Sequence, residues 1–346
     1  MNALSLNRKM GATLLLLMCL LLAACGSSTA NKGADHSAVP SANTVEKETG
    51  SSAATGGKEI KHLMGVTQVP AKPQRVFVMQ NEYADHMLTI GEKPYAILVT
   101  PQYNDKLLPY IAGKLGEVEL VKGGSEVLNL EEILELKPDL ILSGKGVGEQ
   151  AYNELSKIAP TVVLGVPDRS ETASKDPNAG LVADDWQIDL MKIAEIFGKE
   201  DTAKQEIAKL DEKMQAASAE IAALPSKRIA YIRVRDNELQ LYGTEGHPLN
   251  YLLFDKLGFQ PSALAQVERM DLSQEKIPEL GADYIFMQAD GADGEKLMGE
   301  ITQSSLWQNV EAVKKNQVFI PEYWLYLSWG KLGREAIIDQ IVEFIK

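Results

Sequence analysis

Residues 129–143 read "NLEEILELKPDLILS", and this stretch decides the fold. Asn129 is a good N-cap for a helix that begins Leu-Glu-Glu-Ile, and Pro138 requires that helix to end. Asp139 then opens a short apolar run, 139–142, with the length and composition of a buried strand. A helix followed directly by a buried strand is the repeating unit of a parallel α/β sheet.

The same alternation continues on both sides of this stretch. Apolar runs at 75–79, 95–99 and 161–164 predict further strands, while 82–90 and about 150–157 have helical spacing. Strands and helices that alternate in this way predict a parallel sheet with helices on both faces.

A long segment with helical spacing follows at 184–224. Gly198 is its one weak point, and Pro225 ends it. At 1.5 Å per residue, the part from Glu200 alone would span about 36 Å. That length exceeds what a crossover needs, so we expect a rigid helix between two lobes.

The alternating pattern starts again after Pro225. Strands 228–235 and 238–242 are expected to pair across an Asp236-Asn237 turn. The other elements expected there are helices near 248–257 and 274–280, strand 284–288, a helix near 304–309, strand 317–320 and a helix over 331–345. Two α/β lobes with mainly parallel sheets would enclose a cleft, because ligands of such sheets bind beyond the carboxyl ends of the strands.

The N-terminus carries an export signal. Arg8 and Lys9 precede an apolar run at 12–24, as in a secretory signal peptide. The run ends in Leu-Ala-Ala-Cys, which resembles the lipobox of bacterial lipoproteins, so we expect cleavage before Cys25 and lipidation of this cysteine. The alternative is an ordinary signal peptide with a chance cysteine. The predicted organisation is a signal peptide at 1–24, a flexible tether at 25–58, an N-terminal lobe at 59–183, the interlobe helix at 184–225 and a C-terminal lobe at 226–346.

Composition argues against several classes of function. The 346-residue chain has a formal net charge of −13, whereas a nucleic-acid-binding protein needs a basic surface. Its four histidines form no HExxH motif and no Cys/His cluster, so a protein-bound zinc or manganese is not expected. The segment "SGKGVGEQ" is an incomplete dinucleotide fingerprint, because Glu149 stands at its third glycine position, and no G-x-S-x-G elbow occurs.

Four segments resemble bacterial iron–siderophore and cobalamin substrate-binding proteins of ABC importers. They are "HLMGVTQVPAKPQRVFVMQNEYADHMLTIG" (62–91), "NLEEILELKPDLILS" (129–143), "LSQEKIPELGADYIFM" (272–287) and "LWQNVEAVKKNQVFI" (306–320). The resemblance covers about 61–346 and implies two Rossmann-like lobes joined by one rigid helix, as in class III periplasmic binding proteins. It also implies that Glu131 and Glu275 dock the lobes onto the permease; the alternative is two plain helix-start glutamates, which the helix dipole favours anyway.

A basic pair in "YIRVRD" (231–236) is the first candidate for the ligand. In a strand, Arg233 and Arg235 share one face while Ile232 and Val234 share the other. Guanidinium groups match carboxylates and chelating oxygens, and the resembling siderophore receptors place arginines in the equivalent stretch. The alternative is a solvated strand end paired with an acid such as Asp236 or Glu238.

Further candidates come from loops that follow strands and from the start of the long helix. Aromatic rings suit the half-apolar surface of a ferric chelate, although core packing explains each of them equally well. These candidates are Tyr103, Lys145, Trp186, Gln288, Trp324, Tyr326 and Trp329.

The sequence therefore predicts a lipid-anchored receptor on the outer face of the cytoplasmic membrane, in a Gram-positive cell. It would bind a ferric siderophore as a monomer, without an intrinsic cofactor, and deliver it to an ABC permease. The basic set is small, which favours a hydroxamate or mixed hydroxamate–carboxylate siderophore over a catecholate. Two alternatives stay open: a haem or cobalamin receptor of the same fold, with His247 or a methionine on a haem iron, and a lipoprotein-anchored α/β enzyme.

Overall fold

The computed structural model describes residues 57–100, 105–124, 128–165 and 186–345. The expected signal peptide, most of the expected tether, Cys25 and Tyr103 lie outside these ranges. Among the described residues, no helix combines the length and apolar character that a membrane span needs.

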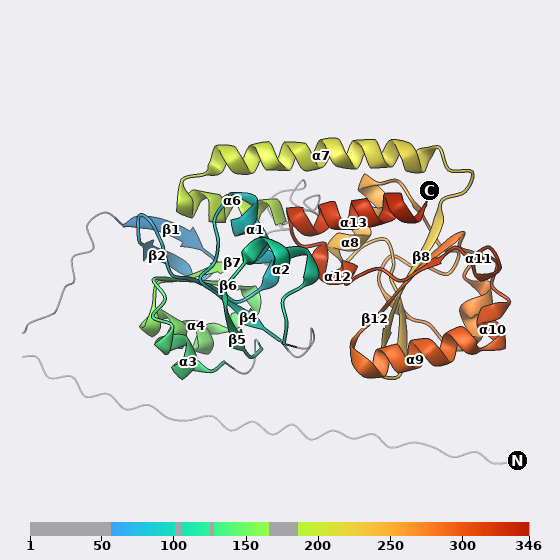
Figure 1. Cartoon of the computed structure of the whole chain (residues 1–346), viewed down its shortest axis with the longest axis horizontal. Helices are drawn as coiled ribbons and strands as arrows, with labels where there is room; N and C mark the ends of the chain where they lie inside the picture. Colours follow the sequence, from blue (N-terminus) through green and yellow to red (C-terminus); the bar gives the residue numbers. More distant parts are fainter. Residues whose placement is uncertain (1–56, 101–104, 125–127, 166–185, 346) are drawn as a thin grey trace, which may run out of the picture. The chain divides into compact units, whose positions relative to one another are not determined.

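The N-terminal sheet has five parallel strands in the order β5-β4-β3-β6-β7 (Figure 1). They are β3 (Val76–Val78), β4 (Ala96–Val99), β5 (Glu119–Lys122), β6 (Leu140–Gly144) and β7 (Thr161–Leu164). Four of them confirm the predicted strands. Strand β5 was not predicted, because it has only two apolar residues between its charged ends. This is a Rossmann-type strand order, in which the direction of winding reverses between β3 and β6.

Helices and a hairpin surround this sheet. The hairpin was not predicted, nor was α2, and both lie in segments without a clear apolar period. These elements are β1 (Lys58–His62), β2 (Gly65–Val69), α1 (Asn81–Thr89), α2 (Pro109–Leu115), α3 (Leu130–Glu135), a 3-10 turn at Lys145–Val147 and α4 (Glu149–Ile158).

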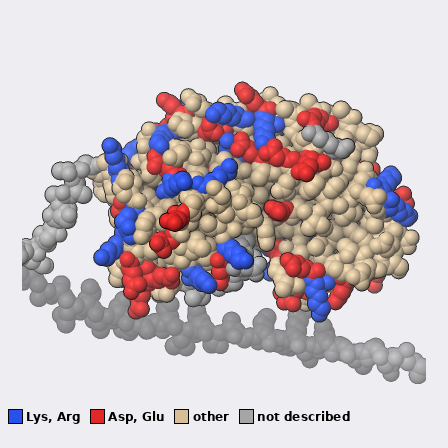
Figure 2. All heavy atoms as spheres, viewed as in Figure 1, with Lys and Arg blue, Asp and Glu red and all other residues tan. Residues whose placement is uncertain are grey.

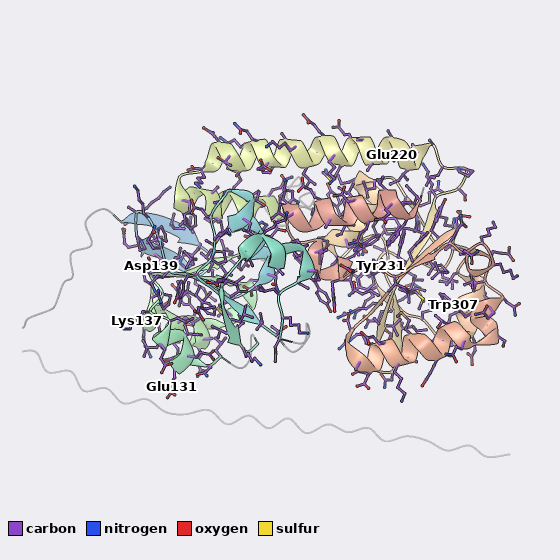
Figure 3. The ribbon with its side chains drawn as sticks, viewed as in Figure 1. Glu131, Lys137, Asp139, Glu220, Tyr231 and Trp307 are labelled. Carbon is purple, nitrogen blue, oxygen red and sulfur yellow. The ribbon has the colours of Figure 1, made fainter. Side chains whose placement is uncertain are left out.

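Within 129–143 the predicted helix cap and the predicted start of a strand are both present. The Asn129 side chain accepts a hydrogen bond from the backbone N–H of Glu132 at 3.2 Å, which caps α3. The Asp139 carboxylate accepts the backbone N–H groups of Gln74 and Arg75 at 2.7 and 2.9 Å, and Figure 3 labels this residue beside the sheet. Asp139 thus ties the beginning of β6 to the beginning of β3.

The long helical segment is broken where its weak point lies. Helix α6 (Trp186–Phe197) ends at Gly198, whose φ of 66° is left-handed, and α7 (Glu200–Ala222) follows. The expected single helix is therefore two helices. Figure 1 shows α7 passing over both α6 and α13 (Lys331–Phe344), and it contacts both. Acids and bases are interspersed along its outer side in Figure 2.

The C-terminal sheet is mixed, in the order β11-β9-β8-β12-β13, with β10 also paired to β8. The predicted hairpin of β8 (Arg228–Arg235) and β9 (Glu238–Leu241) is confirmed, and β8 runs parallel to β12 (Tyr284–Ala289). The remaining strands are β10 (Gln260–Pro261), β11 (Met270–Asp271) and β13 (Val318–Phe319). Both sheets belong to one compact unit, so the predicted lobe boundaries stay predictions.

The helices of the C-terminal half differ most from the prediction. The expected helix at 248–257 is a short α8 followed by a π-helical segment, and the one at 274–280 is a 3-10 helix containing Pro278. Helix α9 was missed because glycines at 291, 294 and 299 dilute its pattern. The elements are α8 (Pro248–Asn250), the π-helix Tyr251–Lys256, the 3-10 helix Gln274–Glu279, α9 (Gly291–Gln303), α10 (Ser305–Gln308), α11 (Glu311–Lys314) and α12 (Trp324–Leu327).

A buried carboxylate joins the N-terminal half to the last helix. Asp85 of α1 is fully buried, and its two oxygens accept the backbone N–H groups of Leu332 and Gly333 at 3.0 and 2.9 Å. These N–H groups belong to the first turn of α13, where the helix dipole favours a negative charge. Burial raises the pKa of Asp85 to about 6, although these hydrogen bonds oppose the rise. The close approach depends on small residues, since a Cβ at Gly330 would lie 2.4 Å from the Asp85 carboxylate.

We predict that Gly333→Ala lowers the free energy of unfolding by about 2 kcal/mol or more, because its Cβ would lie 2.0 Å from the backbone oxygen of Leu327. Gly299→Ala, inside α9 with nothing within 4 Å of the added Cβ, is the matched control. It should be neutral or stabilise the fold by up to about 1 kcal/mol. Urea unfolding of both variants measures the difference, and equal free energies would contradict the close packing of α13 on the backbone of Leu327.

Candidate ligand-binding site

The carboxyl ends of β8 and β12 bring polar side chains together. In the parallel register Arg233 lies opposite Gln288, and Asp290 follows the end of β12 directly. The predicted two faces of β8 are confirmed, because Ile232 and Val234 belong to one core cluster and Tyr231, labelled in Figure 3, to another.

Arg233 and Asp290 form an ion pair that is largely shielded from water. The exposed fractions of their side chains are 12% and 11%. Arg233 Nε donates to Asp290 Oδ2 at 2.7 Å, and Nη2 donates to the same oxygen. The hydroxyl of Tyr326 accepts from Arg233 Nη2 at 2.7 Å and donates to Asp290 Oδ2 at 2.6 Å. Burial by itself would lower the pKa of Arg233, but Asp290 raises it above its ordinary value, so the guanidinium stays charged.

Gln288 supports this pair from inside the protein. It is 2% exposed, and its amide donates to Asp290 Oδ1 at 3.0 Å. Its carbonyl oxygen accepts from the Tyr231 hydroxyl at 2.6 Å and from the Leu325 backbone N–H at 3.3 Å. Gln288 was predicted as a ligand contact, but the hydrogen bonds found here hold Asp290 and α12 in place.

Arg235 differs from Arg233 although both lie on the same face of β8. It pairs with Glu238 across the hairpin at 3.3 Å, and the side chains are 44% and 37% exposed. This is the solvated strand end that the sequence analysis left as the alternative. Exposed pairs of this kind contribute little energy, so the two arginines are not equivalent.

The candidate aromatic residues divide by their exposure. Trp324 is fully buried, stacks on Tyr231 and donates from its indole to Gln340 at 2.8 Å. Trp329 is 39% exposed and meets the His247 ring edge-on, with 5.4 Å between centroids. Exposure therefore makes Trp329, and not Trp324, the ring that can offer a surface to a ligand.

His247, which meets Trp329 edge-on, is neutral. Burial, followed by the fields of Arg233, Arg334 and Arg269, lowers the pKa of His247 to about 3. Its Nδ1 accepts the backbone N–H of Leu249 at 3.2 Å, so the proton of the neutral ring is on Nε2. His247 is thus an uncharged hydrogen-bond donor beside an exposed indole.

Two candidates belong to the N-terminal half. Lys145 is exposed and directly follows β6, next to the point where the strand order reverses. Trp186 begins α6 and is only 3% exposed; the guanidinium of Arg334 lies 5.2 Å from its ring centroid, and the ring of His86 stacks at 6.4 Å. In the described structure Trp186 therefore packs inside the protein.

Comparison with known proteins settles the family. A family model described as "Periplasmic binding protein" matches residues 78–322, more than half of the chain. The chain belongs to this family. The resemblance and the two-sheet α/β fold expected from the sequence are thereby confirmed.

Several relatives of this periplasmic binding protein have assigned ligands. It is 30% identical to the "Probable siderophore-binding lipoprotein YfiY" of Bacillus subtilis, over 86% of each chain. It is 29% identical to the "Iron(3+)-hydroxamate-binding protein FhuD" of the same species, over 90% of each chain. Among solved structures, Staphylococcus aureus SirA complexed with staphyloferrin B has 29% identity and a TM-score of 0.64, covering 83% of this chain and 98% of SirA.

Family membership decides the class of function. Periplasmic binding proteins bring substrates to ABC transporters outside the cytoplasm and are not enzymes, so the prediction of a binding protein is confirmed and the α/β enzyme has no support. Within the described residues, no group of three or more His, Cys, Asp or Glu side chains could hold a metal ion.

The two glutamates predicted to dock onto a permease are both exposed. Glu131 is in the first turn of α3, which Figure 3 shows at the lower edge of the N-terminal half. Glu275 is in the first turn of the 3-10 helix Gln274–Glu279. Both are therefore available to a partner, and their function stays a prediction.

Sequence reasoning missed two residues of the site. Asp290 was overlooked because its partners Arg233 and Tyr326 are 57 and 36 positions away. His247 was considered only for haem. The position of Asp290 in the sequence could have identified it. It comes just after the predicted strand 284–288, and an α/β sheet presents its site residues where its strands end.

Proposed function

We propose that this periplasmic binding protein captures a ferric siderophore and delivers it to an ABC permease for iron uptake. The names of YfiY and FhuD, and the ligand of SirA, support this substrate class. The observation that carries the proposal is the arrangement of Arg233, His247 and Trp329. Arg233 offers a guanidinium fixed by its ion pair, His247 a neutral N–H donor and Trp329 an exposed indole. These groups suit a large chelate with oxygens on its surface and apolar edges.

Binding would use hydrogen bonds to the chelate and not bonds to iron. The three contacts of Arg233 with Asp290 and Tyr326 use Nε and Nη2, so Nη1 has no hydrogen-bond partner among the described residues. Nη1 and His247 Nε2 would donate to outer oxygens of the siderophore, while Trp329 packs against its apolar part. Lys145, and Tyr103 outside the described residues, would contribute from the N-terminal half. These contacts need residues of one chain only, so the receptor would act as a monomer.

His247 argues against haem as the ligand. A histidine that ligates iron presents a bare nitrogen to the metal and donates its other ring N–H to a protein acceptor. Here Nδ1 accepts a backbone N–H and the proton is on Nε2, which is the opposite arrangement. Of the two alternatives within the family, haem held by His247 is therefore the weaker.

We predict that Arg233→Ala weakens binding of the preferred ferric siderophore by roughly 1.5–3 kcal/mol, because it removes a hydrogen bond from a charged group. Arg235→Ala is the matched control on the same strand and should change the dissociation constant by no more than about threefold, since its exposed pair contributes little. Tryptophan fluorescence titration with ferric siderophores, haem and cobalamin measures both. Binding of haem or cobalamin alone would refute the proposed substrate.

Delivery would depend on Glu131 and Glu275. Charge reversal at either position, Glu131→Lys or Glu275→Lys, is expected to abolish iron uptake and leave ligand affinity unchanged. Glu135→Lys and Glu279→Lys change acids that are also exposed, at the other ends of the same two helices, and should retain uptake. The comparison requires radiolabelled iron uptake in cells, and normal uptake by the first two variants would exclude these residues as docking contacts.

The anchor proposed for the receptor is lipid on Cys25, which holds the chain at the outer face of the cytoplasmic membrane of a Gram-positive cell. Several acyl chains on one residue make a stable anchor. Cys25→Ser is expected to abolish incorporation of labelled palmitate and to release the protein into the medium. Membrane retention of this variant would show that another segment provides the anchor.

A further inference from the structure

Charge in the candidate site is already compensated inside the protein. The Arg233 guanidinium has its counter-ion, Asp290, in direct contact, and each side chain is about nine-tenths buried. A charge pair so close has a weak field at a distance, because the opposite charges cancel for any third group farther away than their separation. The pair offers a ligand directed hydrogen bonds but almost no net charge.

Most neighbouring groups add little positive field; the exception is Arg334, which is fully buried and whose charge reaches His247. His247 is neutral, and its ring presents only an N–H dipole. Arg235 is exposed and paired with Glu238, while Arg269 is exposed and follows Glu268 in the chain. Water and salt screen charges at such exposed positions. What the described residues show is that Asp290 cancels the charge of Arg233, the guanidinium that offers Nη1 to a ligand.

We propose that Asp290 determines specificity by cancelling the charge of Arg233, which tunes the site to ferric complexes with no net charge. This inference rests on the proposed function. Iron(III) held by three singly charged hydroxamates is neutral overall, whereas iron(III) held by three doubly charged catecholates has three negative charges. The uncharged complex has oxygens that accept from Nη1 of Arg233. The trianionic complex would meet the Asp290 carboxylate just behind that guanidinium, and repulsion would offset much of the attraction.

Equilibrium titrations with two probes test the proposal. Ferrichrome is an uncharged ferric trihydroxamate, and ferric enterobactin is a trianionic ferric tricatecholate. The unmodified protein should bind ferrichrome more tightly. Asp290→Asn should shift the ratio of the two dissociation constants on the order of tenfold or more toward ferric enterobactin, because it leaves Arg233 charged without a counter-ion. The double variant R233Q/D290N, which has neither charge, should return the ratio close to its original value.

Glu238→Gln is the matched control, because it removes the partner of Arg235 in the exposed pair. It should change the ratio by no more than about threefold. Tighter binding of ferric enterobactin by the unmodified protein would overturn the proposal, and so would an unchanged ratio in Asp290→Asn. If a variant does not fold, the ratio of the two dissociation constants of the unmodified protein still tests the proposal. Absence of binding to every ferric chelate would instead refute the proposed function itself.

Discussion

The contact of Asp85 with the first turn of α13 is the constraint on which much of the structure depends. A carboxylate that is fully buried has to be hydrogen-bonded, and the donors here are backbone N–H groups of a helix from the other end of the chain. Glycine at 330 follows from this close approach, while Gly333 allows the same turn to pack against the backbone of Leu327. Because α12 and its Tyr326 immediately precede this turn, the contact that fixes α13 also fixes one side of the candidate site.

The site itself is built by two neighbouring parallel strands. The β8–β12 register brings Arg233 beside Gln288, and Gln288 orients Asp290, so one row of the sheet supplies the guanidinium, its counter-ion and their support. A buried ion pair is costly to assemble and adds little to stability. The position of the Arg233–Asp290 pair at a strand end is better explained by function. Asp290 fixes the direction in which the Arg233 guanidinium donates and cancels its charge.

Most of the fold could be predicted from local patterns, and most of the site could not. The helix cap at Asn129, the helix end at Pro138 and the strand after Asp139 depend on residues close by in the chain. Their effects can therefore be predicted from the sequence. Helix α9 escaped because its glycines weaken the pattern, and the break at Gly198 was visible only as a weak point. Trp324 and Trp329 look alike in sequence, yet packing against Tyr231 buries the first and leaves the second exposed. Partners that meet across many residues, such as Arg233 and Asp290, become evident only in three dimensions.

A crystal structure of the receptor with its preferred ferric siderophore tests the central claim most directly. The account predicts a siderophore oxygen about 2.7–3.2 Å from Nη1 of Arg233, with the Arg233–Asp290 pair intact beneath it and the Trp329 ring against the ligand. The account would be contradicted by a ligand bound elsewhere. It would also be contradicted by a ligand that displaces Asp290 and accepts hydrogen bonds from Nε and Nη2 of Arg233 as well as from Nη1.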